Sequence, residues 1–351
     1  MVNLTTDRFA EMLDRFGDLA LAVIGDYFLD KYLIIDPDLA EVSLETGLEA
    51  HQVVAKRISP GAAGTVVSNL RALGVGLVKA IGVTGCDGEG FELRMGLQQL
   101  GADIIGLMED PGSFTPTYTK PMLERPDGTE QELNRIDIRN RRPLSKCMED
   151  LLVKRIRACA GEVDGIIIAD QVAEPDLGVI SPRVREVICQ LGAKRPQMPL
   201  LVDSRANIGQ FTEVIVKPNA SEAARATRLD IDSQITTDQA AAITRRLAER
   251  TGRSVYLTLG HNGIAVRDGE QFTHLPGCRV PGAIDIVGAG DSTTAGIVPA
   301  LCAGASAAEA GLFGNLAASI TIQQLGTTGT ASPQQMRARF AHYRQHHPAM
   351  F

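Results

Sequence analysis

Short apolar runs alternate with longer amphipathic stretches along most of the chain. The runs are continuously hydrophobic rather than alternating, which is typical of parallel strands buried on both faces. Six of them are LALAVIGD (19–26), GLVKAIGVTG (76–85), VDGIIIAD (163–170), MPLLVDS (198–204), EVIVKPN (213–219) and SVYLTLG (254–260). The stretches between them have helical periodicity, and several end at glycine, as helices do. This order predicts an α/β fold: a doubly wound, mostly parallel sheet with helices on both faces.

Two segments interrupt the order. Residues 31–58 and 115–138 are strand-rich and partly alternating, and the second contains Asp127-Gly128, a hairpin turn signal. We expect both segments to form a small β lid beside the main sheet. Because the sequence shows no internal repeat or linker, residues 1–351 are predicted to form one domain. The last ten residues, HYRQHHPAMF, are expected to fray.

Composition excludes several classes of function. A hydrophobic content of 44% supports a sizeable core. With a net charge of -7, the chain lacks the overall positive charge that is typical of nucleic-acid-binding proteins. The six cysteines are widely spaced, which disfavours a zinc site or a disulfide framework and favours reduced thiols in the cytoplasm. Neither a secretory leader nor an apolar run long enough for a membrane span is recognisable. We therefore expect a cytoplasmic protein that binds neither nucleic acid nor membranes.

The octet DIVGAGDS (285–292) directly precedes the apolar run TTAGIVPALCAG. In open α/β sheets, ligands bind beyond the carboxyl ends of the strands, where a helix N-terminus offers unpaired amides to an anion. Gly288, Ala289 and Gly290 carry so little side chain that phosphate oxygens can reach their amides. Asp291, expected to begin the helix, can then accept the proton of an incoming hydroxyl. An ordinary helix start with Asp as its N-cap explains the octet equally well.

The chain resembles the ribokinase-like (PfkB-type) carbohydrate kinases over roughly residues 19–335. The motifs that carry the resemblance, in chain order, are VIGDYFLDKY (23–32), SPGAAGTVVSNLRALG (59–74), TYTKPML (117–123), QELNRIDI (131–138), VKPNASEA (216–223), LTLGHNGIAV (257–266) and GAGDS (288–292). Within the family, this order is most similar to the D-glycero-D-manno-heptose 7-phosphate kinases. The resemblance implies a ribokinase-like fold and a phosphotransferase that uses ATP and Mg²⁺ to phosphorylate a sugar or sugar phosphate.

The resemblance also implies roles for individual residues. The catalytic group comprises Asp291 as base, with Gly288, Ala289 and Gly290 as the anion hole. The substrate-binding group comprises Asp26, Asp30, Gly61, Thr65, Lys120 and Arg135. The nucleotide-binding group comprises Asn219, Glu222, Thr258, Gly260, Gly263 and Asn315, with Asn219 and Glu222 also assigned to magnesium. Lys217 is a further candidate cation.

Each assignment has a purely structural alternative. Asp26 and Asp30 can cap a strand end and pair with Lys31, and Asn219 with Glu222 also reads as a helix capping box. The two glycines of the 257–266 motif suit a hairpin turn, and Asn315 suits the surface of a helix. These roles can coexist with ligand binding.

Several positions depart from the family pattern. Ala62 and Thr65 replace a glycine and an amide in the glycine motif, and Val287 stands where threonine is usual. In the heptose kinases an SDYxKG stretch follows the fourth core strand, but here Asp170 is followed by Ala173 at the lysine position and by Glu174. An unpaired Glu beside a phosphate would be repulsive, so we predict an acceptor other than heptose 7-phosphate, unless Lys120, Arg135 and Arg205 rebuild the phosphate site.

Two alternative functions remain open at this stage. One is a nucleoside or vitamin-type kinase of the same superfamily, and the other is a sugar- or nucleotide-binding relative without turnover. A dehydrogenase is disfavoured because no G-x-G-x-x-G follows residues 19–26. Exposed strand edges in the lid predict a homodimer.

Overall fold

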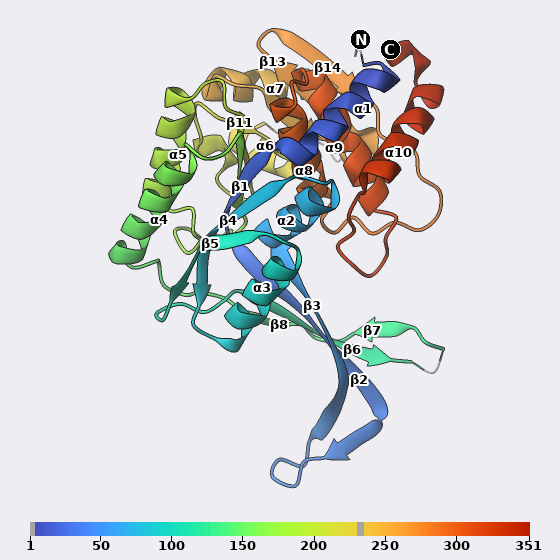
Figure 1. The fold of residues 1–351 in the computed structure, drawn as a ribbon. Helices are drawn as coiled ribbons and strands as arrows, with labels where there is room; N and C mark the ends of the chain where they lie inside the picture. The colour runs from blue at the N-terminus through green and yellow to red at the C-terminus, as the bar shows by residue number, and fades with distance from the viewer. Residues whose placement is uncertain (1–3, 126, 230–234) are drawn as a thin grey trace.

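The computed structural model describes residues 4–125, 127–229 and 235–351. Among these residues, helices cover both faces of a nine-stranded sheet, and a second sheet projects from the body as an arm (Figure 1). The helices are α1 (Thr6–Asp14), α2 (Ala63–Ala72), α3 (Gly88–Gln99), α4 (Lys146–Cys159), α5 (Pro182–Lys194), α6 (Ala220–Thr227), α7 (Thr237–Thr251), α8 (Ala289–Cys302), α9 (Ala307–Thr321) and α10 (Pro333–His346). The predicted fold class is confirmed.

The main sheet has the strand order β14-β13-β12-β11-β10-β9-β1-β4-β5. Its strands are β1 (Ala20–Gly25), β4 (Leu77–Gly85), β5 (Asp103–Asp110), β9 (Gly165–Asp170), β10 (Leu200–Ser204), β11 (Ile215–Val216), β12 (Val255–Thr258), β13 (Ile264–Asp268) and β14 (Gln271–Leu275). Only the pairs β12–β13 and β13–β14 are antiparallel; the other pairs described are parallel. Strands β9 and β10 are buried along their whole length, as their continuous apolar sequences predict.

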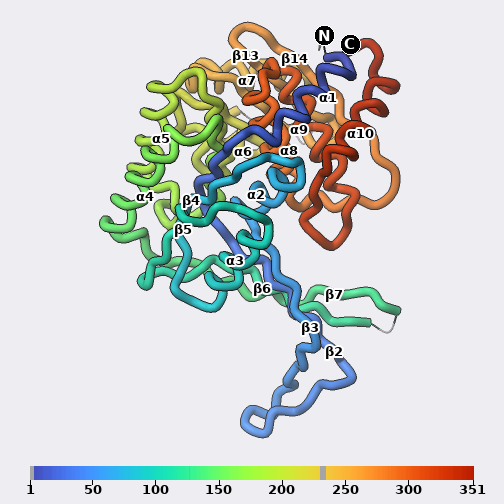
Figure 2. The backbone as a smooth tube through the Cα atoms, in the orientation of Figure 1, coloured from blue at the N-terminus to red at the C-terminus, as the bar shows by residue number. Residues whose placement is uncertain are grey.

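Two hydrophobic layers hold the helices on the sheet. One layer packs α1, α2, α3, α8, α9 and α10 against one face, and the other packs α4, α5, α6 and α7 against the opposite face. Helices α1 and α10 lie side by side at the end of the molecule opposite the arm (Figure 2). The parts of the chain that the structure describes include no helix long and apolar enough to cross a membrane.

The second sheet contains the two segments that interrupt the strand–helix order. It consists of β2 (Tyr27–Val42), β3 (Glu49–Ala62), β6 (Thr117–Glu124), β7 (Glu130–Glu132) and β8 (Ile136–Ile138). Strands β2 and β3 form a long antiparallel hairpin, and β6 joins β2 in parallel. Residue 126, within the predicted segment 115–138, lies outside the described residues. The hairpin between β6 and β7 turns through Gly128, whose φ is 77°, as the Asp127-Gly128 signal predicts.

Three features differ from the sequence expectations. Strands β5 and β14 were not anticipated, because both are edge strands whose partly exposed residues form no continuous apolar run. Helix α8 begins at Ala289, so Asp291 lies within its first turn rather than at its start. The C-terminal residues do not fray, since α10 continues to His346. Phe351 packs edge-on against Phe340 at a centroid distance of 5.7 Å, and this contact holds the end of the chain on the core.

Candidate active site

The carboxyl ends of β1, β9, β10, β11 and β12 converge beside the N-terminus of α8, where an open α/β sheet presents its ligand site. Gly288 precedes α8 with a φ of 77°, in the left-handed region that favours glycine. A Cβ at Gly288 would lie 3.3 Å from Thr328 and 3.4 Å from Thr65, so the turn also lacks room for a larger residue. Thr65 of α2 therefore flanks the predicted anion hole.

The backbone amides of this turn are not all available to a ligand. The Ala289 amide donates to the Ile286 carbonyl at 3.2 Å. The amides of Gly290 and Asp291 donate no hydrogen bond to any residue in the described ranges. Gly290 leaves space in front of them, since a Cβ there would meet only the Lys217 ammonium at 3.5 Å and an Asp203 oxygen at 4.0 Å. Of the predicted anion-hole amides, that of Ala289 is therefore engaged, whereas that of Gly290 is available together with the amide of Asp291.

Asp291 is the carboxyl group at the centre of the site. Burial raises its pKa to about 7, and the neighbouring carboxylate of Asp203 adds to the increase. The positive charges of Lys217 and Arg205 act in the opposite direction, while the charge of Asp30 raises the pKa further. Because all four charges act on one carboxyl, residues from β2, from β10, from the turn at 205 and from the position directly after β11 lie around it. A carboxyl with a pKa near neutrality is suited to general-base catalysis.

A buried ion pair lies against the first turn of α8. The Lys217 ammonium is 3.0 Å from Oδ2 of Asp203, and both side chains are buried. The hydroxyl of Thr294 in α8 donates to the same oxygen at 3.4 Å, which ties the pair to the helix. Burial lowers the pKa of Lys217, but the charges of Asp203, Glu222 and Asp291 outweigh it and raise the pKa above its ordinary value. The lysine is therefore held in its charged form.

Asn219 and Glu222 form the capping box of α6. The Asn219 amide donates to Oε2 of Glu222 at 2.8 Å, and the Glu222 amide donates to the Asn219 side chain at 2.9 Å. Burial raises the pKa of Glu222, and Asp203 raises it further, whereas Lys217 lowers it. The structural alternative for this motif is therefore present.

The same residues fit a magnesium ion bound mainly through water and phosphate. Asp203, Glu222 and Asp291 supply three carboxylates within electrostatic range of one another, and Lys217 is the cation that acts on all three. Arg205 also acts on Asp291 and Arg225 on Glu222, so the negative charge that a divalent cation would offset is mainly that of bound phosphates. The described residues contain no group of three His, Cys, Asp or Glu side chains arranged as a metal cage. Such a cage is not required, because Mg²⁺ commonly binds through one or two carboxylates and several waters.

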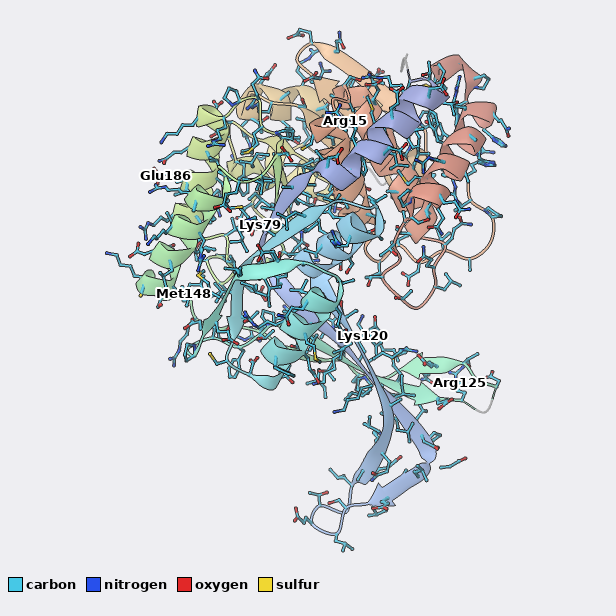
Figure 3. All side chains as sticks on the ribbon, viewed as in Figure 1. Arg15, Lys79, Lys120, Arg125, Met148 and Glu186 are labelled. Carbon is cyan, nitrogen blue, oxygen red and sulfur yellow. The ribbon has the colours of Figure 1, made fainter. Side chains whose placement is uncertain are left out.

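The predicted substrate-binding residues of the lid lie at the root of the arm. Figure 3 shows Lys120 where the arm leaves the body. Asp30 of β2 is 3.6 Å from the Lys120 ammonium of β6, which also donates to the Tyr32 hydroxyl at 3.0 Å. A Cβ at Gly61 would lie 2.5 Å from Oδ2 of Asp30, so this glycine lets the carboxylate lie against β3. Arg135 instead binds Asp137 through two hydrogen bonds of 2.6 and 2.9 Å. Its guanidinium is thus already paired.

Asp26 is fully engaged with backbone amides. Its Oδ2 accepts from Gln171 at 2.8 Å and from Val172 at 3.0 Å, and its Oδ1 accepts from Val179 at 2.7 Å. Burial raises the pKa of Asp26, although the three amides lower it in part. The sequence predicts a direct sugar contact for this residue, whereas the contacts present are all to one loop.

A pocket lies between this loop and the lid. Its walls include Phe28, Tyr118, Arg139, Gln171, Glu174 and Arg205. Arg139 pairs with Glu174 at 2.9 Å, so the acidic residue beside Ala173 is neutralised rather than left unpaired. The Arg205 side chain makes one long hydrogen bond, 3.4 Å, to the Gln171 side chain, and no ion pair with a described residue. Arg139 was not identified from the sequence; the basic cluster RNRR (139–142) after the lid was the available signal.

The predicted nucleotide-side residues have structural roles in the β12–β13 region. Thr258 donates its amide to the Pro218 carbonyl at 3.0 Å, and Asn315 of α9 donates its side chain to the Pro276 carbonyl at 2.7 Å. Gly263, with a φ of 88°, leaves no room for a Cβ, which would lie 2.1 Å from the Leu275 carbonyl oxygen. A Cβ at Gly260 would meet nothing. Gly260 and Gly263 therefore lie in the hairpin between β12 and β13, and Asn315 bonds from α9 to the loop after β14. Nucleotide contact by these residues remains a prediction.

The chain matches known proteins over most of its length. Residues 30–335 match the family described as pfkB family carbohydrate kinase. The chain is 30% identical over 335 residues to the bifunctional protein HldE of Geotalea uraniireducens, covering 94% of this chain and 65% of that protein. It is 28% identical to the bifunctional protein HldE of Citrifermentans bemidjiense, with the same coverage. The chain thus spans slightly less than two thirds of the length of these relatives.

Solved structures share the fold. Phosphofructokinase-2 from Escherichia coli in complex with potassium superposes with a TM-score of 0.69 at 18% identity, covering 93% of this chain and 99% of that one. Ribokinase from Arabidopsis thaliana, complexed with ribose and ATP, superposes with a TM-score of 0.64 at 18% identity, covering 92% and 98%.

Proposed function

The chain belongs to the pfkB family of carbohydrate kinases, and on this premise we propose that Asp291 is the base that lets a sugar or sugar-phosphate hydroxyl attack ATP. The observation that carries the proposal is the position of this carboxyl. It lies in the first turn of α8, beside two free amides and a buried lysine, and its pKa is raised to about 7. A base, an anion hole and a fixed cation are the groups that phosphoryl transfer requires.

In the proposed mechanism, the oxygen of the acceptor hydroxyl attacks the γ-phosphorus of ATP, and the ionised Asp291 accepts the proton of that hydroxyl. The bond from that phosphorus to the bridging oxygen breaks, and ADP leaves. The amides of Gly290 and Asp291 and the ammonium of Lys217 face the negative charge of the transferring group. Asp203 keeps Lys217 charged and directed at the turn.

We assign the magnesium site to Glu222, with Asn219 holding that side chain in place through the capping box. Glu222 would hold the ion directly or through a water, and the ion would supply positive charge that offsets the charge of the ATP phosphates. Oε1 of Glu222 accepts no hydrogen bond from any described residue, so it is the oxygen available to the ion or to one of its waters.

The pocket between the 171–179 segment and the lid is the proposed acceptor site, and Arg205 is the lining residue that connects it with Asp291. Arg205 lies in its wall, acts electrostatically on Asp291 and has no carboxylate partner among the described residues. Because Arg139 neutralises Glu174, the reason to expect exclusion of a phosphorylated acceptor is weakened. We therefore propose a sugar phosphate as acceptor, with its anionic group near Arg205 and its hydroxyls near Asp30.

We also propose that the arm pairs with a second copy of the chain. The tip of the arm exposes apolar side chains at Leu39, Val42, Leu44 and Leu48, and the outer edge of β3 has no neighbouring strand among the described residues. Apolar side chains on an unpaired strand edge favour pairing with another chain. All six cysteines are free, which suits the proposed cytoplasmic location.

The decisive experiment is an acceptor panel with ADP detection. The panel contains D-glycero-D-manno-heptose 7-phosphate, other sugar phosphates, their free sugars and nucleosides. We expect ADP release to depend on a sugar phosphate, and kcat/KM to be about tenfold or more lower for its free sugar, which lacks the charge-assisted bond. A free sugar preferred over its phosphate would refute the proposed role of Arg205. Release driven by a nucleoside would instead place the chain among nucleoside kinases, and nucleotide binding without ADP release would indicate a relative that lacks turnover.

A further inference from the structure

The wall of the acceptor pocket includes a segment with no regular secondary structure. Between β9 and α5, residues 171–179 contain no helix or strand, yet Gln171, Val172, Ala173, Glu174 and Leu177 line the pocket. Within the segment, Asp176 has a φ of 61°, a left-handed conformation that side chains other than glycine seldom adopt. A segment of this kind keeps its shape only where the surrounding structure holds it.

One side chain holds both ends of the segment. Asp26, which directly follows β1, accepts from the Gln171 and Val172 amides where the segment begins and from the Val179 amide where it ends. These three bonds use both carboxylate oxygens, and the side chain is buried. Gly178 packs directly on the carboxylate, since a Cβ there would lie 3.0 Å from Oδ1 of Asp26. The carboxylate thus closes residues 171–179 into a loop across its base.

A second buried carboxylate holds the opposite wall. Asp170, at the end of β9, accepts from the Ser204 hydroxyl at 2.5 Å and from the Asn207 side chain at 3.1 Å, and its carbonyl accepts from the Arg205 amide at 2.9 Å. These bonds fix the turn that carries Arg205. Strands β1 and β9 are neighbours in the sheet, so the two carboxylates lie next to each other beneath the pocket.

We infer that Asp26 is a positioning residue for the acceptor pocket: it does not contact the acceptor itself but shapes the 171–179 wall, next to the turn that Asp170 holds. This inference rests on the proposed function for its kinetic consequence, but not for its structural one. A direct sugar contact would require an oxygen of Asp26 to leave a backbone amide unpaired, which is costly in a buried site.

Hydrogen–deuterium exchange tests the structural part without any acceptor. In wild-type protein, the peptide covering 171–179 should contain slowly exchanging amides. In Asp26→Asn, one acceptor oxygen becomes an NH₂ group that faces amide donors, so exchange in this peptide should accelerate about tenfold or more. Glu309→Gln is the matched control: Glu309 is also buried and also accepts backbone and side-chain hydrogen bonds, but it caps α9 on another part of the molecule. The control should leave the 171–179 peptide unchanged.

Steady-state kinetics test the functional part, with whichever of heptose 7-phosphate, fructose 6-phosphate and ribose the wild-type enzyme phosphorylates fastest. Asp26→Asn should raise the KM for that acceptor about tenfold, with kcat and the KM for ATP changed less than about twofold. Gly178→Ala leaves the carboxylate intact but displaces the loop from it, so it should produce the same pattern on a smaller scale and remains informative if Asp26→Asn does not fold.

The outcomes separate the possible roles. An acceptor KM that rises in Asp26→Asn but not in Gly178→Ala would overturn the inference in favour of direct contact, as would unchanged exchange of the 171–179 peptide. Equal increases in KM for acceptor and ATP would also overturn it, because they would indicate a general loss of structure. If wild-type protein phosphorylates none of the three, the proposed function is in question, while the exchange experiment still decides the role of Asp26.

Discussion

Replacing Asp291 by Asn should make the protein inactive and, at the same time, more stable. The folded structure holds the pKa of Asp291 at about 7, against an ordinary value of 3.8, mainly through burial. The difference of about 3 units, at about 1.4 kcal/mol per unit, means that the folded state disfavours the ionised carboxyl by roughly 4 kcal/mol. Asn has nearly the same shape and no charge, so the variant escapes this cost while losing the base.

The sign of the pH dependence follows from the direction of the shift. Because the folded pKa lies above the unfolded one, the cost is absent below about pH 4, grows as the pH rises, and is complete above about pH 7. At about pH 5.5 it amounts to roughly 2 kcal/mol, half of its value at about pH 8. The stability gain of Asp291→Asn should therefore be about 2 kcal/mol larger at the higher pH. Urea unfolding of wild type and variant at both pH values measures this difference.

Activity provides the second half of the test. Asp291→Asn should lower kcat by roughly two to four orders of magnitude while ATP still binds. In the wild-type enzyme, kcat/KM for the acceptor should fall about tenfold per pH unit below about pH 7, as the base becomes protonated. Asp285→Asn is a matched control in the same loop, because the side-chain oxygen of the new Asn can still accept the hydrogen bond from the backbone amide of Val287. A variant with near wild-type turnover, or with the same stability gain at both pH values, would refute the role assigned to Asp291.

Two further predictions concern the metal and the arm. Glu222→Gln should raise the Mg²⁺ concentration for half-maximal rate severalfold, because an anionic oxygen is lost near the ion. The control Glu309→Gln, which changes another capping box, should not raise it. If wild type and Glu222→Gln need the same Mg²⁺ concentration, Glu222 has only its helix-capping role. Light scattering should give the mass of a homodimer. Leu44→Asp with Leu48→Asp should shift this mass toward that of the monomer, because pairing in the proposed dimer would bury the new charges. A monomeric mass for the wild-type chain at micromolar concentration would contradict the proposed pairing.

Much of the fold was predictable because its signals are local. The buried strands are continuous apolar runs, and the helices between them have their own caps, such as Gly252 after α7. Strand β5 was missed because an edge strand is only partly buried and lacks that signal. The position of the site followed from topology alone, since motifs at the carboxyl ends of parallel strands necessarily meet at one edge of the sheet.

The sequence by itself identified several residues that the fold brings together, such as Lys217, Glu222 and Asp291, but not what each can do there. Asp26, Asp30 and Asp291 are the same residue type in the sequence. In the structure, burial raises the pKa of Asp291 to about 7, whereas the carboxylate of Asp26 accepts hydrogen bonds from three backbone amides. Glu174 reads as a repulsive charge until the fold brings Arg139, from the end of the lid, to within 2.9 Å of it. These properties depend on burial and on distances between residues remote in the chain. Local sequence encodes neither, so only the tertiary structure decided them.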